Sequence, residues 1–172
     1  MNFKSKIRNI PDFPEKGIVF RDICPLLEDK VIFKAAVDEL VRRIGKNKID
    51  KVIGIDARGF ILAGVLAHRL KAGLVLVRKK GKLPYKTVEE EYNLEYGKAA
   101  LAIHQDSIKK GERVLLADDV LATGGTMRAA ASLVEKLGGK IAMIVFLTIL
   151  DYLPGQKILA DYKLISLVNY RK

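Results

Sequence analysis

Short, continuously apolar runs alternate along this 172-residue chain with longer segments that have helical periodicity. The apolar runs that we expect to form strands span residues 52–55, 74–77, 97–103, 113–117, 141–148 and 164–168. The segments with apolar residues at helical spacing span residues 28–44, 59–70 and 126–137. Strands that are apolar throughout are buried on both faces, and helices between successive strands cover those faces. The alternation therefore predicts an α/β fold in which a mainly parallel β-sheet is flanked by helices.

Two segments do not follow this alternation. Residues 10–27 carry three of the five prolines, and residues 79–96 are polar, first basic and then acidic. A long polar insertion inside a compact domain usually serves a function. No repeat or flexible linker separates the remaining segments, so we expect one continuous domain over residues 1–172.

Composition and charge narrow the class of protein. Lys and Arg number 31 and Asp and Glu number 20, which gives a formal net charge of +11 and favours anionic partners. The single cysteine, Cys24, allows no intramolecular disulfide and indicates a reducing compartment, and we expect its thiol to be buried and unreactive. No apolar stretch approaches the ~20 residues of a membrane-spanning helix. We therefore expect a soluble, cytoplasmic protein without a membrane partner.

Residues 113–126 contain the most informative motif of the chain. Apolar residues lead to Asp118 and Asp119, and a Thr-Gly-Gly-Thr turn at residues 123–126 then opens into a helix. The two glycines let backbone amides approach a ligand closely, and the two hydroxyls and the positive helix N-terminus add further attraction for an anion. This combination predicts a phosphate-binding turn. Neither a P-loop nor a dinucleotide-binding fingerprint is present in the sequence, which argues against those two classes of enzyme.

The two adjacent carboxylates of Asp118 and Asp119 suggest what else the ligand carries. They would repel a phosphate, but they can bind the hydroxyls of a sugar such as ribose 5-phosphate and stabilise positive charge on its ring. An ordinary turn at the end of a strand is the alternative, because Asp, Thr and Gly are common there. The whole set of six residues, however, is expected by chance in on the order of 10⁻⁵ of chains of this length.

This motif resembles the phosphoribosyl-pyrophosphate (PRPP) binding motif of the type I phosphoribosyltransferase family. The resemblance covers nearly the whole chain and is greatest to the members of the family that use adenine. Similar segments form an N-terminal hood, a pyrophosphate loop and two arms of a mobile catalytic loop, here at residues 10–23, 56–60, 78–84 and 92–97. The resemblance implies a type I phosphoribosyltransferase fold with a small hood over roughly residues 1–27 and a mobile loop over roughly residues 79–96.

The resemblance also implies roles for individual residues. Those that would hold the ribose and 5-phosphate of PRPP are Asp118, Asp119, Ala122, Thr123, Gly124, Gly125 and Thr126. The cations that would bind its pyrophosphate are Arg58, Arg78, Lys79 and Lys82. Those that would contact adenine are Val19, Phe20, Arg21 and Leu150. The catalytic residues would be Arg58 and Glu95, of which Glu95 would handle a proton on the imidazole side of the base.

The implied reaction transfers the phosphoribosyl group of PRPP to adenine and yields AMP and pyrophosphate, a step of purine salvage. Its transition state resembles an oxocarbenium ion with an anionic leaving group, which cations and Mg²⁺ stabilise. We expect Mg²⁺ as the cofactor, held mainly by PRPP without a protein metal site, because Mg²⁺ keeps many water and substrate ligands. Residues 79–96 are the candidate lid that excludes water. The family is typically homodimeric, so we also expect a homodimer.

Two alternative functions stay open at this point. Cys24 stands where the family commonly has Thr, and Ile149 where it often has an acid near the base pocket. The substrate could therefore be another purine, such as xanthine or hypoxanthine. The net charge of +11 would also suit a non-catalytic regulator that senses PRPP and binds nucleic acid. The scattered tyrosines and the lack of an added helix-turn-helix segment argue against nucleic acid as a partner.

Overall fold

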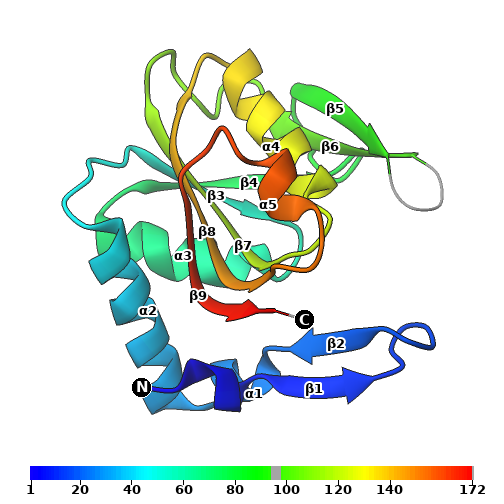
Figure 1. Ribbon diagram of the computed structural model, residues 1–172. Helices are drawn as coiled ribbons and strands as arrows, with labels where there is room; N and C mark the ends of the chain where they lie inside the picture. The colour runs from blue at the N-terminus through cyan, green and yellow to red at the C-terminus, as the bar shows by residue number, and fades with distance from the viewer. Residues whose placement is uncertain (94–97, 172) are drawn as a thin grey trace.

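The computed structural model describes residues 1–93 and 98–171, and a mixed β-sheet lies at its centre (Figure 1). Within the described residues its strand order is β5-β6-β4-β3-β7-β8-β9. The bounds are β3 (Lys51–Ile55), β4 (Gly73–Lys79), β5 (Thr87–Asn93), β6 (Lys98–His104), β7 (Arg113–Leu121), β8 (Lys140–Leu150) and β9 (Leu164–Tyr170). Strands β4, β3, β7, β8 and β9 pair in parallel, whereas β6 is antiparallel to both β4 and β5. The predicted fold class is confirmed.

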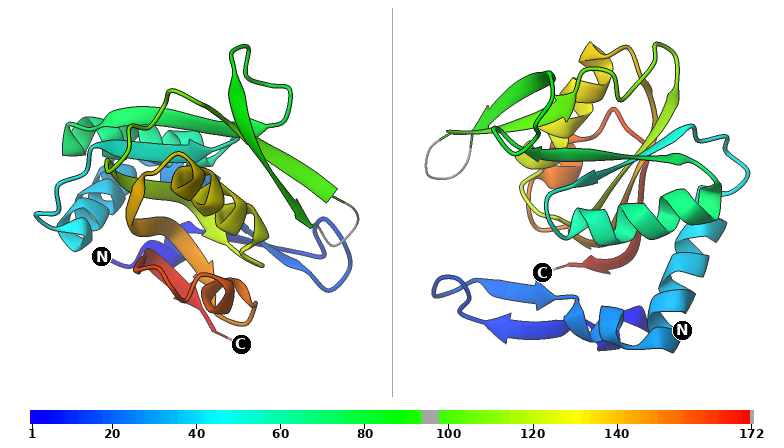
Figure 2. Two further views of the ribbon diagram at one scale, coloured as in Figure 1. Left: turned by 90° about the horizontal axis from the view of Figure 1, so that it is seen from above. Right: turned by 180° about the vertical axis from the view of Figure 1, so that it is seen from behind.

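Helices cover both faces of this sheet, as the apolar strands require (Figure 2). Helices α2 (Lys30–Ile44) and α3 (Gly59–Leu70) pack on one face, and α4 (Gly125–Lys136) with the short α5 (Gly155–Ile158) packs on the other. Successive residues of a strand point to opposite faces. In β7, Leu115 therefore packs with α2 and α3, whereas Leu116 packs with α4. In the described part of the chain, no helix has the length and apolar character needed to cross a membrane.

The N-terminal residues form a separate small unit beside the end of β9 (Figure 1). A 3₁₀ helix, η1 (Phe3–Lys6), precedes strands β1 (Arg8–Pro11) and β2 (Val19–Asp22), which pair antiparallel, and α1 (Cys24–Glu28) follows them. We call residues 8–22 the N-terminal hairpin. This unit packs on the sheet through an apolar cluster that includes Phe3, Leu26, Leu150 and Tyr170.

Strands β5 and β7 illustrate how the structure differs from the sequence expectations. The polar segment 79–96 contains β5, which pairs along its length with β6. Burial alternates along this acidic strand: Val88, Glu90 and Tyr92 are half-buried, and the residues between them are exposed. Strand β7 also continues past the expected end at residue 117 to Leu121, because the apolar end of β8 pairs with it that far.

Candidate functional site

A cavity of about 640 Å³ opens at the carboxyl ends of β3 and β7, where ligands bind in open α/β sheets. Four separate segments line it: residues 18–21 of the N-terminal hairpin, residues 55–58 at the end of β3, residues 118–124 and 126–127 around the end of β7, and Leu150 and Leu153 at and after the end of β8. The fold therefore brings together segments that lie far apart in the sequence.

Most of the predicted binding residues meet in this cavity. Those that line it are Val19, Phe20, Arg21, Arg58, Asp118, Asp119, Ala122, Thr123, Gly124, Thr126 and Leu150. Gly125 begins α4 directly beside them. Lys79 and Lys82 are exposed and do not line the cavity, and Glu95 lies outside the described residues.

The predicted phosphate-binding turn packs closely against the first residue of α5, and both residues at this contact are glycines. Gly124 has a φ of +89°, and a Cβ built on it would lie 2.9 Å from Cα of Gly155, the first residue of α5. A Cβ on Gly155 would in turn lie 2.4 Å from the carbonyl oxygen of Ala122. The Gly155 N–H donates to that same oxygen over 3.1 Å. No sequence pattern singles out this role of Gly155, although the Pro-Gly pair at residues 154–155 is a turn signal.

The two carboxylates occupy different surroundings at the end of β7. Asp118 lies against the first residue of α3, since a Cβ on Gly59 would be only 2.7 Å from Asp118 Oδ1. The same oxygen accepts the Asp119 N–H over 2.9 Å. Burial, together with the charge of Asp119, raises the pKa of Asp118 well above its ordinary value. The Asp119 carboxylate is only 5% exposed and pairs with Arg58, whose Nε lies 2.5 Å from Asp119 Oδ2.

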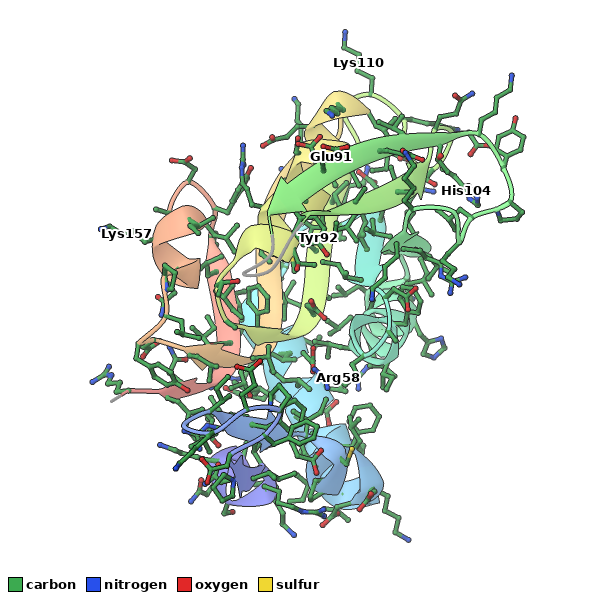
Figure 3. The ribbon with its side chains drawn as sticks, turned by 90° about the vertical axis from the view of Figure 1, so that its right-hand side faces the viewer. Arg58, Glu91, Tyr92, His104, Lys110 and Lys157 are labelled. Carbon is green, nitrogen blue, oxygen red and sulfur yellow. The ribbon has the colours of Figure 1, made fainter. Side chains whose placement is uncertain are left out.

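Arginines link these acids to the neighbouring segments. Arg58 precedes α3 and lies between the sheet and the N-terminal hairpin (Figure 3), with its guanidinium 5.4 Å from the ring centroid of Phe20. Arg78 does not line the cavity, but its Nε lies 3.0 Å from Oδ2 of Asp56, which does. Arg78 Nη1 also donates to the carbonyl oxygen of Lys82. Both arginines are thus paired with carboxylates that an anionic ligand could replace.

The structure also locates the two unusual residues. Ile149 is 3% exposed, packs in the core cluster of α4 and does not line the cavity, whereas its neighbours Leu150 and Leu153 do. Cys24 is exposed, so the expectation of a buried thiol was wrong: α1 is a short helix that buries Leu26 instead. Hydrogen bonding to Asp22 raises the pKa of the Cys24 thiol, which disfavours the reactive thiolate.

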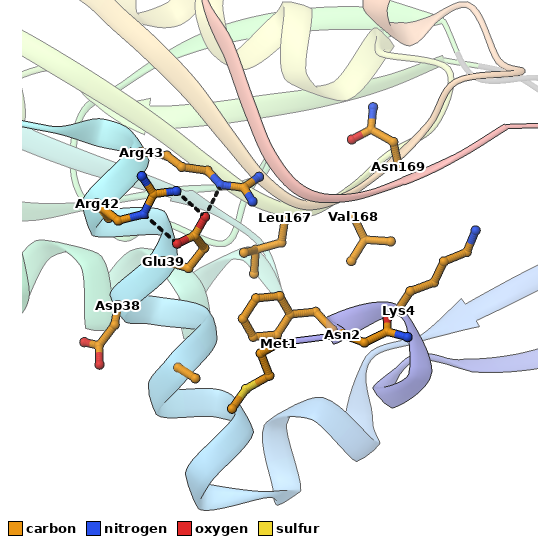
Figure 4. A pocket seen from close by; sticks show the side chains of 12 residues that line it. Met1, Asn2, Lys4, Asp38, Glu39, Arg42, Arg43, Leu167, Val168 and Asn169 are labelled. Atoms are coloured by element: carbon orange, nitrogen blue, oxygen red, sulfur yellow. Dashed lines mark hydrogen bonds and ion pairs between the residues drawn. The ribbon is translucent and has the colours of Figure 1, made fainter.

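A second hollow, of about 720 Å³, lies between η1, α2 and β9 (Figure 4). None of the predicted binding residues lines it. Arg42 and Arg43 both donate to Glu39 there, and these bonds lower the pKa of Glu39 to about 2. Its two arginines are therefore engaged with a carboxylate of the same helix. Among the described residues, no group of three or more His, Cys, Asp or Glu side chains could hold a metal ion.

The site combines a glycine turn at a helix N-terminus with two carboxylates and two arginines at the carboxyl edge of the sheet, a set of groups whose chemistry suits a phosphorylated sugar. In agreement, a family model described as the phosphoribosyl transferase domain matches residues 27–166. The chain belongs to the phosphoribosyltransferase family.

Relatives with high identity to this chain fall within one group of that family. The chain is 56% identical to an adenine phosphoribosyltransferase of Geobacter metallireducens, over 97% of this chain and 98% of the relative. The crystal structure of adenine phosphoribosyltransferase from Thermoanaerobacter pseudethanolicus has a TM-score of 0.95 and 48% identity, and covers 98% of each chain. The Saccharomyces cerevisiae enzyme, solved with adenine and an imino-altritol bisphosphate, has a TM-score of 0.91 and 34% identity over 96% of each chain. Within the family, this chain belongs with the adenine phosphoribosyltransferases.

The contact of Gly155 with the phosphate-binding turn predicts the effect of adding one methyl group. Gly155→Ala should lower the free energy of unfolding by about 1–3 kcal/mol, because the new Cβ overlaps the carbonyl of Ala122. Gly64→Ala in α3 is the control, since its Cβ would meet nothing within 4 Å and should stabilise by about 0.5–1 kcal/mol. Urea denaturation measures both, and equal stability of the two variants would contradict the close packing.

The raised pKa of Asp118 predicts that ionisation of this carboxyl group lowers the stability of the folded protein. The folded protein holds this proton at higher pH than the unfolded chain does, so stability is lost as pH rises through the folded-state pKa. Asp118→Asn should remove that loss, so its stability advantage over the wild type should grow between pH 4 and pH 8. Asp161→Asn, at an exposed position, should show no such trend. A difference between Asp118→Asn and wild type that is constant with pH in urea denaturation would contradict this account.

Proposed function

We propose that this protein transfers the 5-phosphoribosyl group of PRPP to adenine, giving AMP and pyrophosphate in purine salvage. One observation carries the proposal. A single cavity holds a phosphate-binding turn, two carboxylates suited to a ribose, and an apolar region between Phe20 and Leu150 suited to a purine. Membership in the adenine phosphoribosyltransferase group supports the choice of adenine.

PRPP would occupy the part of the cavity beside β7. Its 5-phosphate would accept hydrogen bonds from the amides and hydroxyls of residues 122–126 at the N-terminus of α4, and its ribose hydroxyls would donate to Asp118 and Asp119. Its pyrophosphate would compete with Asp119 for Arg58 and with Asp56 for Arg78. Such exchange is favourable because a diphosphate carries more charge than a carboxylate and matches the bidentate geometry of arginine.

The base would lie against the N-terminal hairpin. Strand β2 pairs with β1 along one edge only, so backbone N–H and C=O groups on its other edge can meet a ligand. Adenine offers a 6-amino donor and a ring nitrogen acceptor, and the backbone of Val19 and Arg21 can supply the complementary pair. Ile149, the departure that would have suggested another purine, is buried away from the cavity and does not bear on this choice.

The reaction breaks the bond from C1 of the ribose to pyrophosphate and forms a bond from C1 to a ring nitrogen of adenine. The carboxylates of Asp118 and Asp119 would stabilise positive charge on the sugar ring, and Arg58, Arg78, Lys79 and Lys82 would stabilise the leaving pyrophosphate. Adenine loses a proton from that nitrogen, and Glu95 would accept it. Mg²⁺ prefers oxygen ligands, which the diphosphate of PRPP offers, so PRPP would hold most of its coordination; when bound, Mg²⁺ would offset the charge of the pyrophosphate.

Three further features belong to the proposal. The segment 79–96 would form the lid of the site and residues 1–27 its hood. A homodimer is supported by exposed apolar side chains on α3 and β4, namely Ile61, Leu74 and Leu76, beside a stretch of β4 that β6 leaves unpaired. A cytoplasmic location is supported by the single, free cysteine.

The direct test is release of pyrophosphate from PRPP and Mg²⁺ with a panel of bases: adenine, hypoxanthine, guanine, xanthine and orotate. We expect turnover with adenine at a rate at least tenfold above any other base. Turnover with another base would place the error in the purine subsite, at the N-terminal hairpin and Leu150. PRPP binding without turnover of any base would contradict an enzymatic function and favour a PRPP sensor.

The role of Glu95 predicts a loss of rate without a loss of affinity. Glu95→Gln should lower kcat about 10²-fold or more, the usual contribution of a general base, and leave the KM for PRPP within twofold. Glu89→Gln is the matched control from the same acidic run, because Glu89 pairs with Lys80 on the surface and should be neutral. Equal kcat values for Glu95→Gln and the wild type, measured by pyrophosphate release, would remove Glu95 from the mechanism.

A further inference from the structure

The ring of Tyr170, at the end of β9, lies between cations from two parts of the N-terminal unit. The guanidinium carbon of Arg21, from β2, lies 4.0 Å from its centroid, and Nζ of Lys4, from η1, lies 4.7 Å from it. Tyr170 is only 4% exposed and Arg21 is half-buried, so their contact is largely shielded from water, whereas Lys4 is exposed. Shielding strengthens the attraction between a cation and an aromatic face.

The surroundings of the Arg21 side chain show that the ring is its main partner. Its Nη1 donates to Asn9 of β1, and its Nε is buried without a hydrogen-bond acceptor among the described residues. The Tyr170 hydroxyl is likewise buried without a hydrogen-bond partner in the described part of the chain, so the ring and not the hydroxyl makes the contact. Burial of the hydroxyl raises its pKa, and it therefore stays neutral.

Tyr170 also contacts the opposite wall of the base cavity. It stands directly across from Leu150 in the pairing of β8 with β9, and the two share one apolar cluster. Leu150 and Arg21 line the cavity from opposite elements, the sheet and the N-terminal hairpin. One buried ring therefore connects the two walls between which a purine would lie.

We propose that Tyr170 is a positioning residue for the purine. Its ring holds the side chain of Arg21, and through it the backbone of β2, at the separation from Leu150 that the base requires. The proposal rests on the function proposed above, and it explains why position 21 carries an arginine although the backbone of that residue would read the base. Among the described residues, the ring contacts of Tyr170 go to Lys4 and Arg21, and its hydroxyl bonds to neither the turn nor the carboxylates, so binding of the sugar phosphate should not depend on it.

The test compares the affinity of the full-length protein for AMP with its affinity for ribose 5-phosphate, measured by isothermal titration calorimetry. The two ligands differ by the base alone, so their difference in affinity reports the purine subsite. Tyr170→Leu should lower the affinity for AMP about five- to tenfold and leave the affinity for ribose 5-phosphate within twofold of the wild-type value. Tyr170→Phe, which keeps the ring and removes an unpaired hydroxyl, should bind both ligands like the wild type.

Arg21→Met tests the same contact from the other side and reports it even if Tyr170→Leu is unstable. It should lower the affinity for AMP by a similar factor. The variant that carries both substitutions should bind AMP at least as tightly as the single variant with the lower affinity, because both substitutions remove the same interaction. Unchanged affinity for AMP in both single variants would overturn the proposal. An equal loss of affinity for AMP and for ribose 5-phosphate would also overturn it, as would a loss of affinity for AMP in Tyr170→Phe. A wild-type protein that binds AMP no better than ribose 5-phosphate would instead contradict the proposed function itself.

Discussion

The contact between the end of β7 and the start of α3 is the constraint on which the site depends. Asp118 fits there because residue 59 has no side chain, and the carboxylate meets the positive N-terminal end of α3. Burying a carboxylate next to a second one costs stability, which the raised pKa of Asp118 reflects. This loss of stability arises at one position, Asp118. The adjacent ion pair of Arg58 with Asp119 offsets part of the negative charge of the two carboxylates. Such a departure from the usual pairing of buried charges is typical of functional sites, and the proposed binding of a ribose would require both carboxylates.

The cavity is divided between two structural units, and this division gives each ligand part its own support. In the proposed function, the sheet and the N-terminus of α4 would provide the phosphate and ribose positions, and α5 contacts their turn through Gly155. The N-terminal hairpin would provide one wall of the purine position, and its unit packs on the sheet through a small apolar cluster. Only some of the many Lys and Arg side chains of the chain lie at this site. Many other cations form exposed pairs, such as Arg42 with Glu39 and Lys34 with Asp38, which are worth roughly 0–1 kcal/mol each.

The sequence predicted the elements whose signals are local. Strands that are apolar throughout and helices of regular periodicity identified the α/β class, and the Asp-Asp and Thr-Gly-Gly-Thr pattern pointed to a segment that lines the cavity. Contacts between distant segments were harder to foresee. Strand β5 was missed because its burial comes from packing on α4, while three consecutive glutamates gave the appearance of a loop. Gly155 and Tyr170 were missed because their importance lies in what they touch, and the exposure of Cys24 depended on the orientation of a one-turn helix.

The central claim is that one cavity positions a phosphate, a ribose and a purine for reaction, and a crystal structure of the protein with AMP tests it most directly. The account predicts the phosphate at the amides of residues 122–126, the ribose hydroxyls on Asp118 and Asp119, and the base between Phe20 and Leu150. A phosphate bound outside that turn, or a ribose without hydrogen bonds to either carboxylate, would contradict it.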